Sequence, residues 1–250
     1  MSTRRLATGG LIDRSSPITF TWDGKKRAGY SGDTLASALI ANGDRVVGRS
    51  FKYHRPRGVM SAGVEESGAI VTVGTGSRTD PNVKATVQEL YDGLVARGQN
   101  AWPSVRFDLG SVSNLLGRFF AAGFYYKTFM GIPPLEWGSG TGMWMRYERI
   151  IRRAAGMGEA SRLPDPDHYE HAHAFCDVLV VGAGPAGIAA ARATAEAGLN
   201  VVLVEQDSLL GGTQLSTPSC GSGLIPSVEE LESMGVRVMT RTTAFGLYDY

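Results

Sequence analysis

Three glycines stand at the spacing of a dinucleotide-binding bend. Gly182, Gly184 and Gly187 form a G-x-G-x-x-G pattern between an apolar run that ends at Val181 and an Ala-rich segment typical of a helix. The first glycine permits a tight turn, the second lets a pyrophosphate approach the main chain, and the third brings the helix close to the sheet. Because a helix N-terminus adds free N–H groups and a partial positive charge, the pattern predicts phosphate binding here.

An acidic residue follows where such sites hold the ribose. Glu205 lies 23 positions after Gly182, and a separation of about 20 is expected. Its carboxylate would accept hydrogen bonds from ribose hydroxyls and repel a 2′-phosphate, which favours NAD or FAD over NADP. Gly212 and Thr213 belong to a second glycine turn expected at the same sheet edge. The pattern alone does not decide between FAD and NAD. It also leaves open the alternative that the glycines serve only to pack the helix on the sheet.

The elements around these residues predict half of a doubly wound sheet. Strands are expected over 177–181, 200–204 and 236–239, and helices over 188–197 and 228–233. This βαβαβ order is that of a Rossmann-type domain. Because the first strand is almost continuously apolar, we expect it to be covered on both faces. The sheet is cut short, so we expect the chain to be the N-terminal part of a longer polypeptide with an incomplete nucleotide-binding domain.

The N-terminal part predicts a smaller α+β roll of the ubiquitin-like or ferredoxin-like kind. A strand over 18–22 leads into the hairpin dipeptide Asp23-Gly24. A helix then begins at Asp33 or Thr34 and ends at Asn42-Gly43. A strand over 70–73 and a helix over 85–95 follow. The predicted organisation is a tail over 1–16, a ferredoxin-like domain over 17–95, an aromatic-rich linker over 96–170 and a nucleotide-binding domain over 171–250.

Composition excludes several classes of function. The chain has 25 basic and 24 acidic residues and a net charge of +1, so no global field attracts nucleic acid or an anionic membrane. Its two cysteines, Cys176 and Cys220, exclude a disulfide framework and a four-cysteine metal or iron–sulfur site built from this chain alone. No apolar run reaches the ~18 residues that cross a bilayer. Because no apolar core follows Arg4 and Arg5, we do not expect residues 1–10 to be a secretory signal. The cytoplasm is the predicted location.

Two polar clusters leave alternatives open. A basic run predicts either a solvated loop, the more frequent case, or a contact with a flavin phosphate or a partner. A histidine group predicts a solvated linker rather than a metal site, because no regular element there would fix a ligand geometry. The basic run comprises Arg45, Arg49, Lys52, His54, Arg55 and Arg57, and the histidine group comprises His168, His171 and His173.

Several motifs resemble the α subunit of heterotetrameric sarcosine oxidases. They are G-D-T-L-A-S-A-L at 32–39, R-S-F-K-Y-H-R-P-R-G-V-M-S-A-G-V-E-E-S-G-A-I-V-T-V at 49–73, K-T-F-M at 127–130 and Y-E-R-I-I-R-R-A-A-G-M-G at 147–158. The resemblance continues into the dinucleotide motif and so covers most of the chain. Cluster-bearing relatives carry several cysteines just after the R-P-R-G turn, where this chain has Met60, Ser61, Glu66 and Ala69. We therefore expect a ferredoxin-like domain without a metal cluster.

The resemblance implies that this chain binds NAD. Ala186, Glu205, Gln206, Asp207 and Thr213 match NAD-contacting positions of the family. No catalytic or metal-ligating residue is predicted on the chain. The full set of predicted cofactor-binding residues is Gly182, Gly184, Pro185, Ala186, Gly187, Glu205, Gln206, Asp207, Gly212 and Thr213.

The resemblance also implies a larger enzyme with β, γ and δ subunits. The β subunit would hold FAD, the sarcosine site and a covalent FMN at the α/β boundary, and a separate part of the α subunit would use tetrahydrofolate. The complex would oxidise sarcosine to glycine, form hydrogen peroxide and pass the one-carbon unit to tetrahydrofolate, and the fragment alone would be inactive. The alternatives are a subunit of a related FAD- or NAD-dependent amine or amino-acid dehydrogenase, a non-catalytic scaffold, and a self-sufficient FAD reductase.

Overall fold

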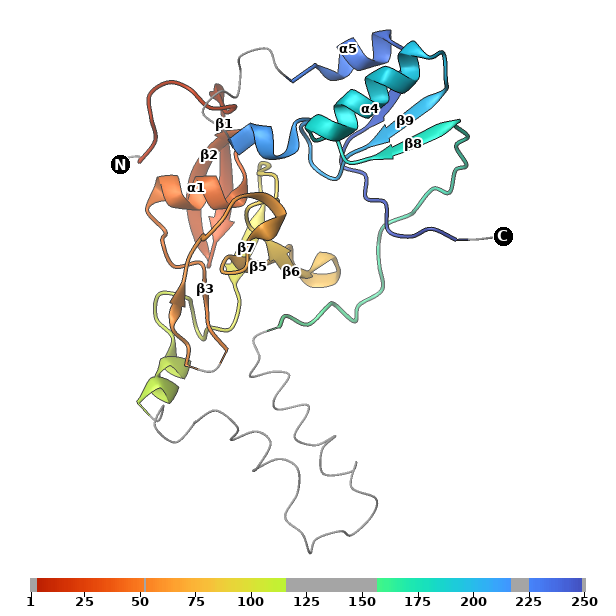
Figure 1. Cartoon of the computed structure of the whole chain (residues 1–250). Coiled ribbons are helices and arrows are strands. Elements are labelled where there is room, and N and C mark those ends of the chain that lie inside the picture. Colours follow the sequence, from red (N-terminus) through yellow and green to blue (C-terminus); the bar gives the residue numbers. More distant parts are fainter. Residues whose placement is uncertain (1–3, 52, 116–156, 217–224, 249–250) are drawn as a thin grey trace, which may run out of the picture. The chain divides into compact units, whose positions relative to one another are not determined.

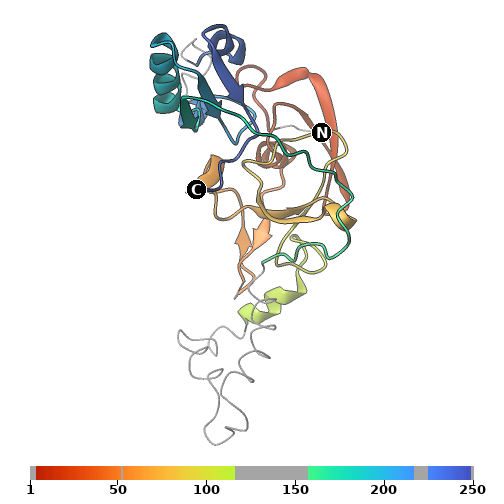
Figure 2. The same cartoon turned by 90° about the vertical axis from the view of Figure 1, so that its right-hand side faces the viewer.

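The computed structural model of the chain describes residues 4–51, 53–115, 157–216 and 225–248. The chain forms two compact units, one mainly of Ile12–Pro166 and the other mainly of Asp167–Tyr250. Figure 1 labels most of the elements of each unit, and Figure 2 shows the same elements from a second side. The middle of the predicted linker and Cys220 lie outside the described residues. Among the described residues, no helix is long and apolar enough to cross a membrane.

The first unit contains a mixed five-stranded sheet in the order β2-β1-β7-β5-β6. The strands β1 and β7 run parallel, and the other neighbouring pairs run antiparallel. This mixed sheet, with a helix packed in its core, agrees with the predicted α+β class. The strands are β1 (Asp13–Trp22), β2 (Lys25–Ser31), β5 (Ile70–Val73), β6 (Asp80–Lys84) and β7 (Val95–Gly98), with a separate ribbon of β3 (Gly48–Arg49) and β4 (Pro56–Arg57) and short 3₁₀ turns at Gly63–Glu65, Gly76–Arg78 and Leu109–Asn114.

The helix α1 (Leu35–Asn42) forms as predicted, because the sequence supplies a capping residue at each of its ends. Thr34 and Ser37 form a capping box at the start, each side chain accepting from the other's main-chain N–H. Gly43 ends the helix in the left-handed conformation, at φ 84°. The fully buried Leu35 and Leu39 belong to the same core as Phe20 and Trp22 of β1, and this core fixes the helix on the sheet.

The predicted helix over 85–95 is wrong. The segment is instead an irregular crossing beside the N-terminus of α1, where Leu35 N–H donates to Gln88 O and Ala36 N–H to Ala85 O. Gly93 adopts φ 81°, which a helix interior does not allow. The segment's main-chain groups therefore find partners in α1 and β1, and these tertiary hydrogen bonds outweigh its helix propensity.

The second unit is a three-stranded parallel sheet in the order β10-β9-β8. Helices α4 and α5 contact this sheet, as expected for a Rossmann-type region. Its core holds Ala191, Leu203, Leu231 and Val236. The elements are β8 (Val178–Val181), α4 (Pro185–Glu196), β9 (Val201–Val204), a 3₁₀ turn at Gly212–Ser216, α5 (Val228–Ser233) and β10 (Val236–Met239), so every strand and helix predicted here is present with small shifts at its ends.

The expectation that β8 is covered on both faces is wrong for the described residues. The strand lies at one edge of the sheet, and Leu179 and Val181 are 55% and 62% exposed. By contrast, all four residues of the central strand β9 are buried. Both strands are continuous apolar runs in the sequence, but only the central strand β9 is buried in the described structure.

Candidate functional site

The bend between β8 and α4 has a geometry that only glycine permits at two positions. Gly182 adopts φ 93°, and its N–H donates to Val204 O at 2.8 Å, which ties the end of β8 to β9. A Cβ on Gly187 would lie 1.9 Å from Gly182 O. The first turn of α4 therefore packs directly on the bend, as the predicted roles of the first and third glycines require.

The middle glycine faces open space. A Cβ on Gly184 would meet no atom within 4 Å, and φ at this residue is −73°, which any residue can adopt. Gly184 is the N-cap of α4 but has no side chain to cap the helix, and Pro185 at the first position has no N–H. The N–H groups of Ala186 and Gly187 therefore lack intrahelical acceptors. Among the described residues, a group the size of a Cβ at Gly184 would meet no protein atom beside these donors.

Glu205 holds the bend in place from the carboxyl end of β9. Its Oε2 accepts from Ala183 N–H at 2.6 Å and its Oε1 from Asp207 N–H at 3.0 Å. The residue is only 7% exposed. Because each carboxylate oxygen has a further lone pair, Glu205 can still accept from a ribose hydroxyl. Burial raises the pKa of the Asp207 carboxyl, and the charge of Glu205 raises it further.

The second glycine turn closes against the first. Gly211 N–H donates to Ala183 O at 2.8 Å, and Gly212 adopts φ 52° with a Cβ position only 3.2 Å from Gly184 Cα. The turn thus borders the open space in front of Gly184. The structural part played by Ala183 and Gly211 was missed from the sequence, although the adjacent glycines at 211 and 212 were a signal for it.

All ten predicted cofactor-binding positions lie in the second unit, on the bend and the segments that follow β9. Nine of them, all but Gln206, belong to the bend, the second glycine turn or the residues joined to them by the hydrogen bonds above. Gln206 and Thr213 are exposed and contribute side chains at the surface.

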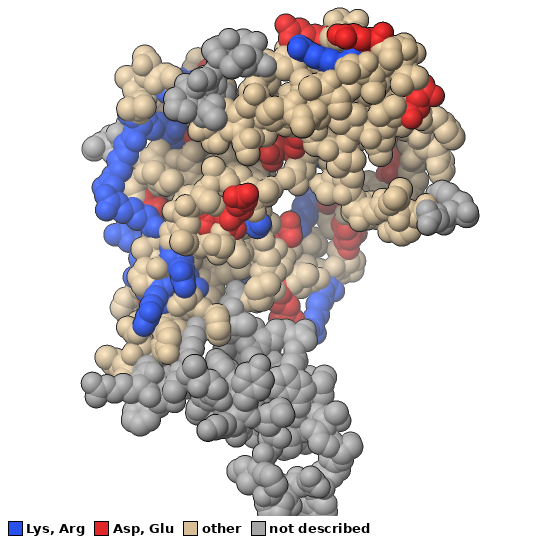
Figure 3. Space-filling view, in the orientation of Figure 1, with Lys and Arg blue, Asp and Glu red and all other residues tan. Residues whose placement is uncertain are grey.

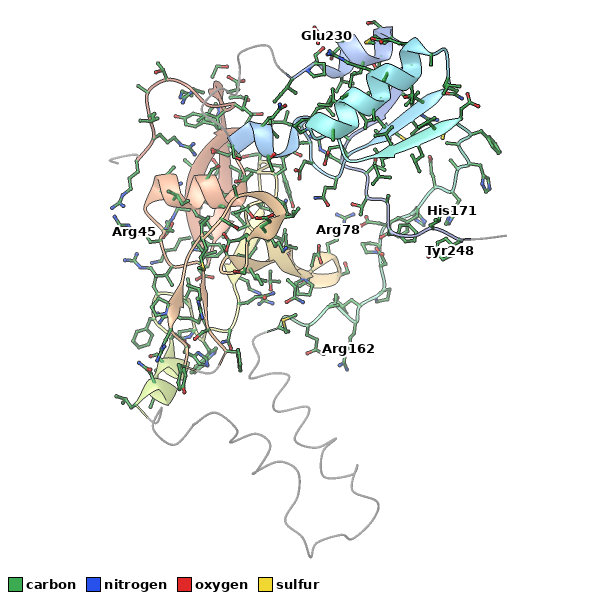
Figure 4. The ribbon with its side chains drawn as sticks, viewed as in Figure 1. Arg45, Arg78, Arg162, His171, Glu230 and Tyr248 are labelled. Carbon is green, nitrogen blue, oxygen red and sulfur yellow. The ribbon has the colours of Figure 1, made fainter. Side chains whose placement is uncertain are left out.

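The basic run of the first unit is partly structural. Arg49 donates to the carbonyls of Val105 and His54, and His54 Nδ1 lies 2.7 Å from Asp108 Oδ2. Arg55 stacks over the Tyr53 ring at 4.8 Å. Basic side chains also gather along one side of this unit in Figure 3, and Arg45 is exposed there (Figure 4). A cavity of about 630 Å³ is lined by Arg49, Arg55 and Arg57 among others.

The histidine group does not form a metal site among the described residues. No set of three or more His, Cys, Asp or Glu side chains in the described ranges could hold a metal ion. His168, His171 and His173 are exposed along the extended segment before β8, where Figure 4 labels His171. Their exposure fits a solvated segment.

The fold and the glycine bend together define a chain that joins a small α+β domain to a Rossmann-type nucleotide-binding region. The family model of a 2Fe-2S iron-sulfur cluster binding domain matches residues 15–101. The family model of an FAD dependent oxidoreductase matches residues 177–232.

The chain is a homologue of sarcosine oxidase alpha subunits along its whole length. It is 53% identical over 257 residues to "Sarcosine oxidase subunit alpha" of Rhizobium meliloti (strain 1021), which covers 100% of this chain and 25% of the relative. The protein of the same name from Corynebacterium sp. (strain U-96) is 32% identical over 252 residues, 96% of this chain and 20% of the relative. The chain thus spans about a quarter or less of these relatives' length. A solved L-proline dehydrogenase from P. horikoshii aligns with TM-score 0.49 and 20% identity, over 95% of this chain and 36% of that chain.

The comparisons overturn the cofactor prediction. The models matched by the chain point to FAD and to an iron–sulfur domain type on this chain, so the prediction of NAD here, with FAD confined to a partner, is wrong. The physical reason is that the glycine bend and the acid recognise an ADP moiety, which NAD and FAD share. The motif spacing therefore could not separate them.

The two implied groups differ in how well the residues fit them. The open space at Gly184 and the uncapped N–H groups of α4 fit the FAD pyrophosphate. A [2Fe–2S] centre needs four soft ligands, commonly thiolates, and residues 15–101 contain no cysteine. The ferredoxin-like domain of this chain therefore has the fold of a cluster-binding domain without the ligands for a cluster.

Proposed function

We propose that this chain binds FAD at the Gly182–Gly187 bend and forms part of the alpha subunit of an oxidoreductase that acts on sarcosine. The observation that carries the FAD site is the open approach to Gly184 beside uncapped helix N–H groups. The homology to sarcosine oxidase alpha subunits supports the substrate. Bound FAD would supply two-electron redox chemistry.

The residues of the bend have separate tasks in this proposal. The N–H groups of Ala186 and Gly187 donate to the pyrophosphate, which the missing side chain of Gly184 admits. Glu205 keeps its two main-chain hydrogen bonds and accepts from a ribose hydroxyl with a remaining lone pair. Gly212 limits the space on the opposite side of the bend.

Four further predicted positions complete the site in the proposal. Pro185 gives the first turn of α4 its fixed φ without adding a donor that needs a partner. Gln206, Asp207 and Thr213 flank the ribose and phosphates at the surface of the site. Their side chains contribute less than the main-chain donors, because they remain accessible to water.

The reaction of the whole enzyme is also part of the proposal. Sarcosine, dioxygen and water would yield glycine, hydrogen peroxide and the N-methyl carbon as formaldehyde: the methyl C–N unit loses two electrons to the flavin, water cleaves the resulting imine, and dioxygen takes up the two electrons. The names of the homologues suggest the substrate and the presence of partner subunits. Transfer of the one-carbon unit to tetrahydrofolate and a cytoplasmic location stay predictions. A subunit of a related amine dehydrogenase is the second candidate, and a scaffold without nucleotide is the third.

Flavin titration of the purified chain tests the FAD site. Wild type should quench flavin fluorescence with saturation. Gly184→Ala should bind at least about tenfold more weakly, equivalent to about 1.4 kcal/mol, and should keep the wild-type melting temperature because its Cβ meets no protein atom. Equal affinity of the two proteins would contradict the site. Absence of binding by wild type would favour the scaffold.

A further inference from the structure

The loop of Met60–Ala69 in the first unit encloses the carboxylate of Glu66. Glu66 Oε2 accepts from Met60 N–H at 2.7 Å and from Ser61 N–H at 2.9 Å. Its Oε1 accepts from the N–H groups of Gly68 and Ala69, the latter at 3.0 Å. The residue is 1% exposed. Four main-chain N–H groups thus converge on one buried anion.

The loop favours a negative charge at its centre. Burial opposes ionisation of Glu66, but the hydrogen bonds from the surrounding N–H groups outweigh it, so the pKa of the carboxyl lies below its ordinary value. Gly68 allows the loop to close this tightly, because a Cβ there would lie 2.5 Å from Gly58 O and 3.2 Å from Glu66 Oε1. The main chain is therefore shaped around an anion, here the chain's own carboxylate.

Three positions of the loop have the spacing of iron–sulfur ligands. Ser61, Glu66 and Ala69 are separated by four and two residues, which is the C-x₄-C-x₂-C run of plant-type [2Fe–2S] proteins. Ser61 Oγ is buried without a hydrogen-bond partner, and Ala69 is fully buried. A buried hydroxyl without a partner is uncommon and calls for an explanation. The hydroxyl of Ser61 is explained if Ser61 occupies a former ligand position that faces the interior of the loop.

A fourth position reaches the loop from further along the chain, as the fourth ligand of such clusters does. Ala85 N–H donates to Ala69 O at 2.9 Å, which places this segment beside the loop. Thr86 Oγ1 then donates to Gly63 O at 2.6 Å. Thr86 is thus a short polar side chain in contact with the loop that the other three positions define.

We propose that Met60–Ala69 is an iron–sulfur cluster loop whose ligand positions have become Ser61, Glu66, Ala69 and Thr86, and that the Glu66 carboxylate has replaced the anionic cluster as the group that orders the loop. The match of residues 15–101 to a cluster-binding family and the absence of cysteine from them are both explained. The domain keeps the conformation of a cluster loop because its own chain supplies the anion. Binding of FAD by the second unit is not required.

Restoring the ligands tests the ancestry of the loop. The chain carrying Ser61→Cys, Glu66→Cys, Ala69→Cys and Thr86→Cys is reconstituted without oxygen with ferrous iron and sulfide. We expect iron and acid-labile sulfide in the ratio of a [2Fe–2S] centre and its electron paramagnetic resonance signal after reduction. A matched control places the third cysteine at the exposed Ser67 instead of Ala69, which breaks the spacing. A folded quadruple variant that binds no more iron than this control would overturn the proposal.

Hydrogen exchange tests the role of Glu66 without relying on the multiple variant. In Glu66→Gln the side chain keeps one acceptor oxygen and gains an NH₂ that faces N–H groups. At least one pair of the four amides should therefore exchange about tenfold faster or more, the size of one lost charged hydrogen bond. Glu65→Gln, at the exposed neighbouring position, should leave exchange unchanged. Unchanged protection of Met60, Ser61, Gly68 and Ala69 in Glu66→Gln would overturn the proposal.

Discussion

Two loops of this chain gather main-chain N–H groups around a carboxylate, and they differ in what they leave free. In the first unit, Glu66 accepts from four N–H groups and is fully enclosed. In the second, Glu205 accepts from two, at Ala183 and Asp207, while the helix N–H groups beyond Gly184 have no capping side chain. The first loop is complete without a ligand, and the second presents donors that a ligand can use.

The difference shows what separates a glycine-rich loop that can bind a ligand from one whose N–H groups are already satisfied by the chain itself. Both loops need a glycine for close approach, Gly68 in one and Gly187 in the other. At Gly184, by contrast, a Cβ would meet no atom within 4 Å, so the missing side chain leaves open space. If the proposal for the Glu66 loop holds, a loop can retain the fold of a cofactor domain after one side chain has taken over the charge of the cofactor.

Removing the enclosed carboxylate should have the largest effect on stability. Glu66→Ala leaves four N–H groups without acceptors, each worth about 1–3 kcal/mol if it stays buried, so the loss is roughly 3–5 kcal/mol after water reaches some of them. Denaturant unfolding monitored by tryptophan fluorescence measures this in the first unit, because all four tryptophans precede residue 145. Glu65→Ala should change stability by less than about 0.5 kcal/mol. Equal stability of the two variants would contradict the role of Glu66.

The glycines of the open bend should separate stability from binding. Gly187→Ala forces a Cβ toward Gly182 O and should lower the free energy of unfolding of the second unit by about 1–3 kcal/mol. Gly184→Ala should leave that free energy unchanged and weaken FAD instead. Far-ultraviolet circular dichroism during thermal unfolding gives the stabilities. If Gly184→Ala destabilised the unit as much as Gly187→Ala, the space in front of Gly184 would not be open.

The enclosed carboxylate should also make the first unit sensitive to acid. Because the pKa of Glu66 is lower in the folded than in the unfolded chain, its stabilising contribution is complete above the unfolded value of about 4.3. The contribution declines as the pH falls below that value and is lost as the pH passes through the folded-state pKa. The stability difference between wild type and Glu66→Gln should therefore shrink on acidification from about pH 5 downward. A difference that is constant with pH would exclude this titration.

The smallest effect is expected at Asp207. Burial and the charge of Glu205 raise its pKa, so the ionised form disfavours folding. Asp207→Asn removes that charge and keeps the main-chain N–H that donates to Glu205. It should stabilise the second unit by up to about 0.5 kcal/mol near neutral pH, and the gain should vanish below the pKa of Asp207. A clear loss of stability of Asp207→Asn in thermal unfolding would show that the Asp207 carboxylate makes a stabilising interaction in the folded chain.

Most of the fold could be predicted where local signals and tertiary packing agree. The capping box at Thr34, the left-handed Gly43 and the apolar strands around the glycine bend all specify the elements that form. The segment over 85–95 could not be predicted, because its conformation depends on hydrogen bonds to α1. The exposure of β8 depends on its place in the sheet order, which the apolar run does not encode.

The position of the candidate site could be predicted from the sequence, but the identity of its cofactor could not. Glycines and an acid at the right spacing identify where an ADP moiety would bind, while the flavin and nicotinamide parts contact residues that the pattern does not include. The role of Glu66 was also not readable, since one glutamate beside Glu65 looks like an exposed acid. Its importance comes from four main-chain donors that only the folded loop brings together.

The most direct measurement is the FAD dissociation constant of wild type beside that of Gly184→Ala, by quenching of flavin fluorescence. If the Gly182–Gly187 bend is open to a ligand, the wild type should bind FAD with saturation. The Gly184→Ala variant should have a dissociation constant at least about ten times larger and the same melting temperature. Equal dissociation constants, or no binding by a folded wild-type chain, would contradict this expectation.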